Sequence, residues 1–279
     1  MPDGHCCPAF LFTSSGMFML NSLQPQIKAL VLDMDGVLWR ANKPVGHLAA
    51  VFARIGELKL KVICATNNAT STPEQFAEKL AGMGVQLASE FILNSALAAA
   101  HYLKKQHPQG GPVYLVGEVG LQQAMQALGF WQAEKDVLAV VTGMDRQFSY
   151  TKLAAATRLI RNGAPFIGTN PDKTFPTPDG LVPGAGSILA AIEAATGVTP
   201  TIIGKPSPYL YQVALERMGT DRLETLAVGD RLETDVLGGQ RAGMRTALVL
   251  SGVSTQHDLV GWPTPPDLVA ADLAELLGI

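Results

Sequence analysis

The sequence predicts an α/β fold built on a parallel sheet, and three observations lead to this prediction. Apolar runs that suit buried strands alternate along the chain with segments of helical periodicity. The chain has 279 residues, of which 47% are apolar, enough for a sizeable core and one or two domains. Several apolar runs also end in chemically useful polar residues, and ligands of open parallel sheets bind at the carboxyl ends of the strands.

The first of these runs, residues 29–32, ends in Asp33-Met34-Asp35-Gly36. Successive side chains of a strand point to opposite faces, so Asp33 and Asp35 can face the same small volume. Gly36 permits a sharp turn and leaves room for a ligand. Two carboxylates this close need a cation or a shared proton, which a magnesium ion with an anionic substrate would satisfy. For this tetrapeptide alone, two solvated aspartates at a capped strand end remain an alternative.

Three further apolar runs end in the same manner. They lead into Thr66-Asn67-Asn68, into Lys205 and into Asp230, which Asp235 follows five residues on. If all these strands belong to one parallel sheet, their polar ends meet at one edge and form a coherent site.

Helix signals fit this alternation. Thr72 is suited to cap a helix, Pro73 to occupy its first position and Gln75 to complete a capping box. A second helix begins at Ser207-Pro208 and ends before Gly219. Both helices follow the polar end of an apolar run, as crossover helices of a parallel sheet should.

A second strand–helix series lies between residues 96 and 181 and lacks the aspartate and lysine pattern of the flanking parts. Its expected strands are 113–116, 137–142 and 165–169, with a helix over 150–161. We therefore predict an inserted cap domain over residues 96–181. The core domain would comprise residues 27–95 and 182–279. Residues 1–26 would be an N-terminal extension or an over-called start, with a targeting role as the alternative.

As a set, Asp33-Met34-Asp35-Gly36, Thr66-Asn67, Lys205 and the segment Gly229–Asp235 resemble the haloacid dehalogenase-like hydrolases. The resemblance covers nearly everything from residue 27 onward. The large insertion and the segments Gly204–Pro208 and Pro183–Ser187 are similar to the branch of the nitrophenylphosphatases and phosphoglycolate phosphatases, with a class IIA cap. The resemblance implies a doubly wound, Rossmann-like core sheet with an inserted α/β cap, and an Mg²⁺-dependent phosphatase.

Within this resemblance, Asp33 is the expected nucleophile, which forms an aspartyl-phosphate and divides hydrolysis into two easier steps. Asp35 is the expected general acid and base. Lys205 would offset the negative charge of nucleophile and phosphate. Mg²⁺ would lie between the Asp33 carboxylate, the Asp35 main-chain carbonyl and the Asp230 carboxylate. Asp235 would orient these ligands or bind through water, with a helix N-terminal acid as the alternative reading.

The phosphate would be held by the Thr66 hydroxyl and by the main-chain N–H groups of Asn67, Met34 and Gly36. Asn68 is equally consistent with a turn residue. Two loops of the cap are candidates for substrate recognition. Their candidate residues are Asp145, Gln147, Asn170 and Asp172, and ordinary cap turns are the alternative.

Composition excludes several other classes. The net charge is −3, from 21 basic and 24 acidic residues, with no basic patch for nucleic acid. The apolar stretch from Pro8 to Leu20 is too short and interrupted to span a membrane and lacks a basic leader. Three cysteines without metal-type spacing favour a reducing, cytoplasmic location.

The expected partner is a small phosphorylated metabolite, with a homodimer possible. Two alternatives stay open at this point. One is a phosphotransferase that uses the same aspartyl-phosphate, and the other is a non-catalytic sensor of phosphate ligands. The sensor predicts a damaged site, whereas all the expected catalytic residues are present.

Overall fold

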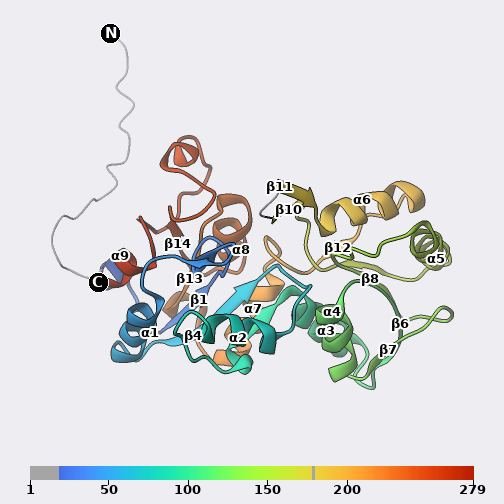
Figure 1. Cartoon of the computed structure of the whole chain (residues 1–279), viewed down its shortest axis with the longest axis horizontal. Coiled ribbons are helices and arrows are strands. Elements are labelled where there is room, and N and C mark those ends of the chain that lie inside the picture. The colour runs from blue at the N-terminus through green and yellow to red at the C-terminus, as the bar shows by residue number, and fades with distance from the viewer. Residues whose placement is uncertain (1–18, 178–179) are drawn as a thin grey trace, which may run out of the picture.

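Two parallel sheets with helices on their faces organise the computed structural model, which describes residues 19–177 and 180–279 (Figure 1). The first sheet has the strand order β15-β14-β13-β1-β4-β5, and every pair in it is parallel. Its strands are β1 (Ala29–Leu32), β4 (Lys61–Thr66), β5 (Ile92–Asn94), β13 (Thr225–Gly229), β14 (Arg245–Val249) and β15 (Leu268–Ala270). The predicted α/β fold with a doubly wound parallel sheet is confirmed.

The first sheet reverses its direction of growth between two central strands. From β1 the chain proceeds outward to β4 and β5, and from β13 it proceeds outward the other way, to β14 and β15. Crossover connections therefore leave the sheet in opposite directions on the two sides of the β1–β13 pair. Such a reversal opens a crevice at the carboxyl ends of the two strands, which is where ligands of these sheets bind.

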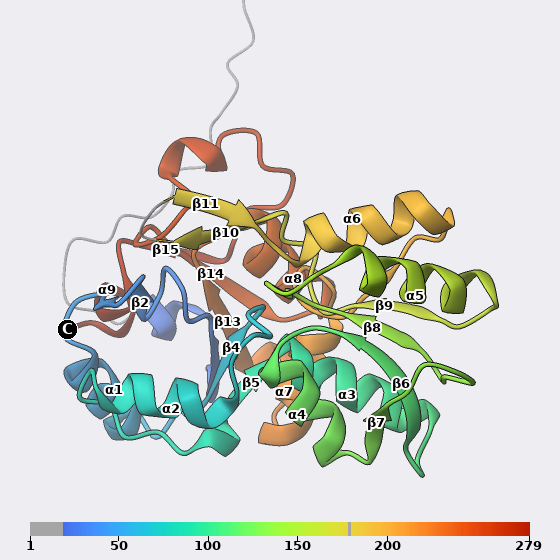
Figure 2. The ribbon, with the colours of Figure 1, turned by 45° about the vertical axis from the view of Figure 1, so that its right-hand side comes forward.

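The second sheet has the order β12-β9-β8-β6-β7 and is parallel throughout (Figure 2). Its strands are β6 (Gly111–Val116), β7 (Phe130–Gln132), β8 (Val140–Thr142), β9 (Phe166–Gly168) and β12 (Thr201–Ile202). This sheet also reverses its strand order, between β6 and β8. The two parts of the chain thus repeat one topology.

One prediction about the sheets is wrong. The run before Lys205 was expected in the same sheet as Asp33, but its strand β12 pairs with β9 of the second sheet, with Thr201 opposite Ile167. The strand before Lys205 cannot pair next to the site in the first sheet, because both site strands already have two neighbours. Strand β1 lies between β13 and β4, and β13 lies between β1 and β14. The second sheet therefore continues to residue 202, beyond residue 181.

The helices form three groups around the sheets. The outer face of the first sheet is covered by α1 (Leu48–Glu57), α2 (Pro73–Ala81) and α9 (Leu273–Leu277). Between the two sheets lie α3 (Ser95–Gln106), α4 (Val119–Ala127) and α7 (Tyr209–Met218). The outer face of the second sheet is covered by α5 (Tyr150–Arg161) and α6 (Ala185–Thr196). A short helix, α8 (Leu237–Arg241), follows β13. Two hairpins complete the fold: β2 (Trp39–Arg40) with β3 (Lys43–Pro44), and β10 (Thr174–Thr177) with β11 (Gly180–Pro183).

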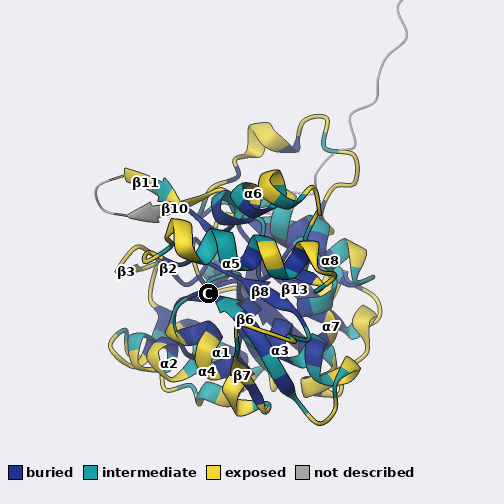
Figure 3. Ribbon diagram, turned by 90° about the vertical axis from the view of Figure 1, so that its right-hand side faces the viewer, coloured by how far each residue is buried: buried dark blue, intermediate teal, exposed yellow. Residues whose placement is uncertain are grey.

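Alternation along β1 explains how the first sheet is held. Leu30 and Leu32 face the core beneath α1 and α2, whereas Ala29 and Val31 face the core shared with α3 and α7. That second core also contains Val141 of the second sheet, so apolar packing is continuous from one sheet to the other. The central strands of both sheets are buried, whereas the hairpin strands β3 and β11 and the outward turns of the helices are largely exposed (Figure 3).

The helix signals are confirmed where the structure describes them. In the capping box of α2, the Gln75 N–H donates to Thr72 Oγ1 over 3.4 Å, and the Thr72 N–H donates to Gln75 Oε1 over 2.9 Å. Helix α7 ends at Gly219, which has the left-handed conformation expected of a C-cap glycine.

Part of the predicted N-terminal extension packs on the core. A 3₁₀ turn over Met19–Ser22 lies against α9, and Leu20 and Leu23 are buried. Residues 1–18, with Cys6 and Cys7, are outside the described part of the chain. Within the described residues, none of the helices has the length and apolar character needed to cross a bilayer.

Candidate active site

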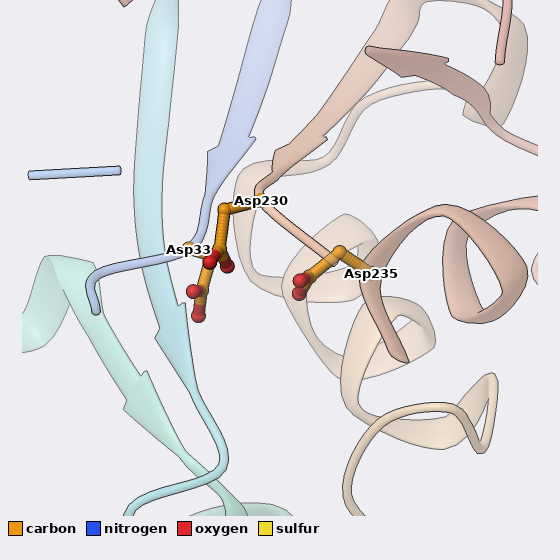
Figure 4. Close-up of side chains that lie close together, drawn as sticks. All are labelled: Asp33, Asp230 and Asp235. Carbon is orange, nitrogen blue, oxygen red and sulfur yellow. The ribbon is translucent and has the colours of Figure 1, made fainter. Parts of the chain in front are cut away.

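The site lies where the first sheet reverses its strand order. Asp33 follows β1 directly and Asp230 follows β13 directly, so their side chains leave two neighbouring strands at the same edge. The Asp33 N–H donates to the Val228 carbonyl over 2.8 Å, which extends the ladder between the two strands to the site. Figure 4 shows both carboxylates converging with that of Asp235, which comes from the helical turn after β13.

These three carboxylates form a buried acidic cluster. One oxygen from each lies within 4.8 Å of one from each of the others. Asp230 Oδ2 accepts the Val253 N–H over 2.8 Å, but Asp230 Oδ1 is buried and has no hydrogen-bond partner among the described residues. A buried carboxylate oxygen without a donor is costly unless a cation binds it, so the cluster fits a hard divalent ion.

Lys205 neutralises part of this charge. Its Nζ is 2.5 Å from Asp33 Oδ1, 2.6 Å from Asp235 Oδ1 and 3.2 Å from the Ala65 carbonyl oxygen. The side chain is only 3% exposed, so these contacts are shielded from water. The structure therefore brings the predicted Asp33, Asp230, Asp235 and Lys205 together.

Burial and charge shift the titration of these groups. Burial opposes the charge of Lys205, but the carboxylates of Asp235 and Asp33 outweigh it and hold the pKa of Lys205 well above its ordinary value. Burial, reinforced by the charges of Asp235 and Asp230 and opposed by Lys205, raises the pKa of Asp33. Burial, together with Asp235, raises the pKa of Asp230 to about 6. In the metal-free protein, protons thus compete for the oxygens that a cation would bind.

Gly36 allows this close assembly. Its φ of +88° lies in the left-handed region, and a Cβ there would be 2.3 Å from Asp230 Oδ2. Any side chain at this position would push the Asp230 carboxylate out of the cluster. The predicted turn glycine therefore has two independent physical requirements.

Asp235 is more deeply integrated than predicted. Its Oδ2 accepts the Arg231 N–H over 3.1 Å and the Thr234 hydroxyl over 3.2 Å, and its main-chain oxygen accepts the Tyr211 hydroxyl over 3.0 Å. Only its Oδ1 faces Lys205. These bonds fix Asp235 as the counter-charge of the ammonium, as well as a member of the acidic cluster.

Asp35 lies at the rim of the site and is exposed. The buried indole of Trp39 donates from Nε1 to Asp35 Oδ1 over 2.8 Å. Trp39 belongs to β2, the strand directly after the Asp33–Gly36 turn. The carboxyl group is therefore held by its own hairpin and borders the same cavity as Asp33.

The segment after β4 is held by hydrogen bonds within its own turn and to the main chain of Lys205. Thr66 lies at the end of the strand, and its Oγ1 accepts the Asn68 N–H over 3.1 Å. Asn68 Oδ1 accepts from the N–H and the hydroxyl of Thr70, which is the turn role that the sequence left open. The Asn67 side chain is turned toward the main chain of Lys205 rather than being free for a ligand.

A cavity of about 100 Å³ opens above these groups. The predicted site residues that line it are Asp33, Asp35, Thr66, Asn67, Asn68, Asn170, Asp172, Lys205 and Asp235. The Met34 side chain is fully buried in the core. Met144, which begins one of the two predicted recognition loops, also lines the cavity; the sequence analysis missed other lining residues, among them Thr174, Phe175, Arg231 and Thr234.

The loop after β9 closes one side of the cavity. Asn170 Nδ2 donates to the Asn67 carbonyl over 2.8 Å, and Asn170 Oδ1 accepts the Asp172 N–H over 3.2 Å. Burial raises the pKa of Asp172, and a hydrogen bond from the Asn67 amide opposes this shift. The structure thus places both predicted residues of this loop, Asn170 and Asp172, on the lining of the cavity.

The other predicted recognition residues do not line this cavity. Asp145 is buried, with Oδ2 at 2.6 Å from Lys152 Nζ and Oδ1 accepting the Gln147 N–H over 2.9 Å. The two predicted residues, Asp145 and Gln147, line a separate hollow next to Glu118, which follows β6. The ion pair with the partly exposed Lys152 turns Asp145 toward α5, so its neighbour Met144 borders the catalytic cavity and Asp145 does not.

Some of the missed residues had a recognisable signal in the sequence and others did not. Arg231 and Thr234 lie inside the Gly229–Asp235 segment, where a charged and a hydroxyl side chain between two site aspartates were an available signal. Thr174 and Phe175 reach the cavity through the β10–β11 hairpin, and nothing in their local sequence indicates this position.

Comparison with known proteins agrees with this geometry. A family model described as haloacid dehalogenase-like hydrolase matches residues 30–131, and a related model of HAD-hydrolase-like proteins matches residues 202–276. An acid sugar phosphatase of Staphylococcus aureus is 39% identical over 253 residues, which cover 90% of this chain and 97% of that protein.

Solved structures are similar over the same extent. The 4-nitrophenylphosphatase of Thermotoga maritima has a TM-score of 0.86 at 34% identity, covering 91% of this chain and 97% of the other. The glycerol phosphate phosphatase of Mycobacterium tuberculosis, solved in complex with calcium, has a TM-score of 0.83 at 33% identity, covering 89% of this chain and 74% of the other.

Proposed function

This chain belongs to the haloacid dehalogenase-like hydrolases, as a phosphoric monoester hydrolase of the nitrophenylphosphatase-like branch, and from that premise we propose an Mg²⁺-dependent mechanism through an aspartyl-phosphate. The substrates we propose are small phosphomonoesters. One observation carries the proposal: three buried carboxylates surround a single buried ammonium, and one carboxylate oxygen has no donor among the described residues.

The carboxylates of Asp33 and Asp230, with the main-chain carbonyl of Asp35, would hold the ion. An all-oxygen set with few protein carboxylates suits Mg²⁺, which keeps several waters. The bound ion would neutralise charge on the phosphoryl oxygens. Asp235, which is tied to Lys205 and to the Arg231 N–H, would orient this set rather than coordinate directly.

In the first step, a carboxylate oxygen of Asp33 attacks phosphorus and the bond from phosphorus to the ester oxygen breaks. Asp35 donates a proton to the leaving alkoxide. Its place at the rim, fixed by the Trp39 indole, supports this role because the leaving group must depart toward solvent. Lys205, in contact with Asp33, would offset the negative charge that the nucleophile and the phosphoryl oxygens bring together in the transition state.

In the second step, a water molecule attacks the phosphorus of the aspartyl-phosphate. Asp35, now a carboxylate, takes a proton from this water, and the bond between phosphorus and Asp33 breaks. Inorganic phosphate leaves and both carboxyl groups return to their starting states. The Thr66 hydroxyl and the main-chain N–H groups of Asn67, Met34 and Gly36 are proposed to hold the phosphoryl oxygens in both steps.

The identity of the leaving group is proposed only as a class. The relatives named above act on sugar phosphate and glycerol phosphate by their names, and we therefore propose these first for a substrate screen. The small cavity, bordered by Met144 and Phe175, supports a compact leaving group. A cytoplasmic location and a homodimer remain predictions of the sequence.

The test is release of 4-nitrophenol from 4-nitrophenyl phosphate by the purified protein, with and without Mg²⁺. We expect activity that requires Mg²⁺ and that falls by roughly 10⁴-fold or more in Asp33→Asn, whose circular dichroism spectrum stays native. Equal release by the wild type and Asp33→Asn would refute the assignment. Adding glycerol distinguishes the transferase alternative, because transfer would produce glycerol phosphate in place of inorganic phosphate.

A further inference from the structure

The main chain leading to Lys205 belongs to the second sheet, whereas its ammonium group lies at the end of the first sheet. The segment before it is bonded along β9 of the second sheet, with the Ile203 N–H donating to Gly168 O over 3.0 Å and the Gly204 N–H to Thr169 O over 2.7 Å. Its ammonium meets Asp33 at the end of the first sheet. The position of the charge therefore depends on what fixes the Lys205 main chain to the first sheet.

The side chain of Asn67 makes that connection. Asn67 follows β4 of the first sheet, and its amide spans the main chain of Lys205 on both sides. Asn67 Oδ1 accepts the Lys205 N–H over 2.8 Å, and Asn67 Nδ2 donates to the Lys205 carbonyl over 3.0 Å. A two-point contact of this kind fixes both the position and the orientation of the peptide.

The amide is itself held in one orientation. Asn67 Nδ2 also donates to Asp172 Oδ2 over 3.1 Å, and a carboxylate only accepts, so the nitrogen must face Asp172. The Asn67 carbonyl accepts from Ser95 Oγ over 2.6 Å and from Asn170 Nδ2 over 2.8 Å. Main chain and side chain of Asn67 are therefore both fixed, from loops of both sheets.

The sequence next to Lys205 accommodates this contact. A Cβ at position 204 would be 2.6 Å from Asn67 Oδ1 and 2.4 Å from the Thr169 carbonyl oxygen. Gly204 thus permits the amide to reach the Lys205 main chain, for a reason separate from backbone conformation. Any larger residue there would displace Asn67, Lys205 or both.

We propose that Asn67 is a positioning residue that holds the Lys205 ammonium in catalytic register, and that Asp172 fixes the orientation of the Asn67 amide. This inference rests on the proposed function, because it assigns Lys205 to transition-state stabilisation. It differs from the sequence-based role of Asn67, which used only the main-chain N–H as a phosphate donor.

The kinetic test compares Asn67→Ala with Asn162→Ala. Asn162 is exposed at the end of α5, does not line the catalytic cavity, and is the matched control. Displacing a catalytic charge by about 1 Å costs on the order of 10²-fold in rate. We expect Asn67→Ala to lower kcat by that amount, with a much smaller change in KM, while Asn162→Ala keeps wild-type kinetics. Wild-type kcat in Asn67→Ala would overturn the proposal.

Asp172 supplies a test by conservative rescue. Asp172→Ala removes the acceptor for Asn67 Nδ2, so kcat should fall severalfold. Asp172→Asn presents an amide oxygen to the same nitrogen and should restore most of the loss. Equal kcat in the two variants would contradict the orienting role of Asp172.

Calcium binding, measured by titration calorimetry, distinguishes positioning from general damage. A displaced ammonium no longer competes for Asp33 and Asp235, so Asn67→Ala should bind Ca²⁺ at least as tightly as the wild type. Weaker Ca²⁺ binding together with a lower kcat would indicate a disrupted site and overturn the proposal. A wild type inactive on all phosphomonoesters would instead refute the proposed function, and the calcium titration would then decide the positioning role alone.

Discussion

The two sheets repeat one topology but differ sharply in the charge at the point where their strand order reverses. In the first sheet, between β13 and β1, three buried carboxylates share one buried ammonium. In the second sheet, between β8 and β6, opposite charges pair completely: Asp145 with Lys152 at 2.6 Å, and Glu118 with Arg146 at 2.6 Å. Both places have the geometry of a ligand crevice.

This difference indicates that the sheet topology provides a crevice, and that the balance of charge in the crevice determines whether it binds an ion. A hollow whose charged side chains neutralise one another gains little by binding an ion. The acidic cluster at the first reversal has an excess of negative charge and an unbonded oxygen, Asp230 Oδ1, so it gains free energy from a cation. The following predictions test this contrast, from the largest expected effect to the smallest.

The largest effect is expected for Gly36→Ala. Its Cβ would collide with Asp230 Oδ2, so the acidic cluster cannot form and most of the activity should be lost. Gly46→Ala is the matched control, because Gly46 also has a positive φ, of +64°, but a Cβ there meets nothing within 4 Å. It should lower the free energy of unfolding by about 1–2 kcal/mol and keep wild-type turnover. Similar turnover in the two variants, measured with 4-nitrophenyl phosphate, would refute the steric argument.

Asp230→Asn should raise the Mg²⁺ concentration needed for half-maximal activity by roughly 10-fold or more, because one ligand charge is lost. A metal titration of the initial rate measures this shift. Asp136→Asn, an exposed substitution in the hollow at the far end of the second sheet, is the control and should titrate like the wild type. An unchanged titration for Asp230→Asn would remove this residue from the metal site.

Stabilisation by Mg²⁺ should grow as pH rises from 5 to 7. Folding raises the pKa of Asp230 from its ordinary 3.8 to about 6, so the metal-free folded state binds a proton that the unfolded state has released. The metal-free protein therefore loses stability as pH rises through this window, and Mg²⁺ replaces the proton with less competition at higher pH. Melting temperatures with and without Mg²⁺ at pH 5, 6 and 7 measure the effect. A constant difference across these values would contradict it.

The smallest effect on catalysis is expected for Asp145→Asn at the second reversal. Removing this buried, ion-paired carboxylate should lower the free energy of unfolding by about 1–3 kcal/mol, as measured by urea denaturation. The ratio kcat/KM for a small phosphomonoester should change little, because the side chain does not line the catalytic cavity. A loss of kcat/KM without loss of stability would return Asp145 to substrate recognition.

The sequence predicted those features of the fold and the site that depend on residues close together in the chain. Asp33 and Asp230 were predictable because each directly follows a buried apolar run, and parallel strands end at one edge. The sequence could not predict that β12 belongs to the second sheet, because its pairing with β9 depends on which strands already flank β1 and β13. The direction of the Asn67 side chain is equally non-local, because it turns toward Lys205, 138 residues away. The direction of the Asp145 side chain depends on Lys152, which is only seven residues away but lies on a helix whose position the sequence does not give.

The central claim, that Asp33 accepts the phosphoryl group, is tested most directly by trapping the intermediate. The enzyme would be mixed with substrate and Mg²⁺, quenched in acid and reduced with borohydride, which converts a phosphorylated aspartate to homoserine, and then mapped by mass spectrometry. The account predicts homoserine at position 33 in the wild type and none when Mg²⁺ is withheld. Homoserine at another position, or rapid turnover with none at position 33, would contradict it.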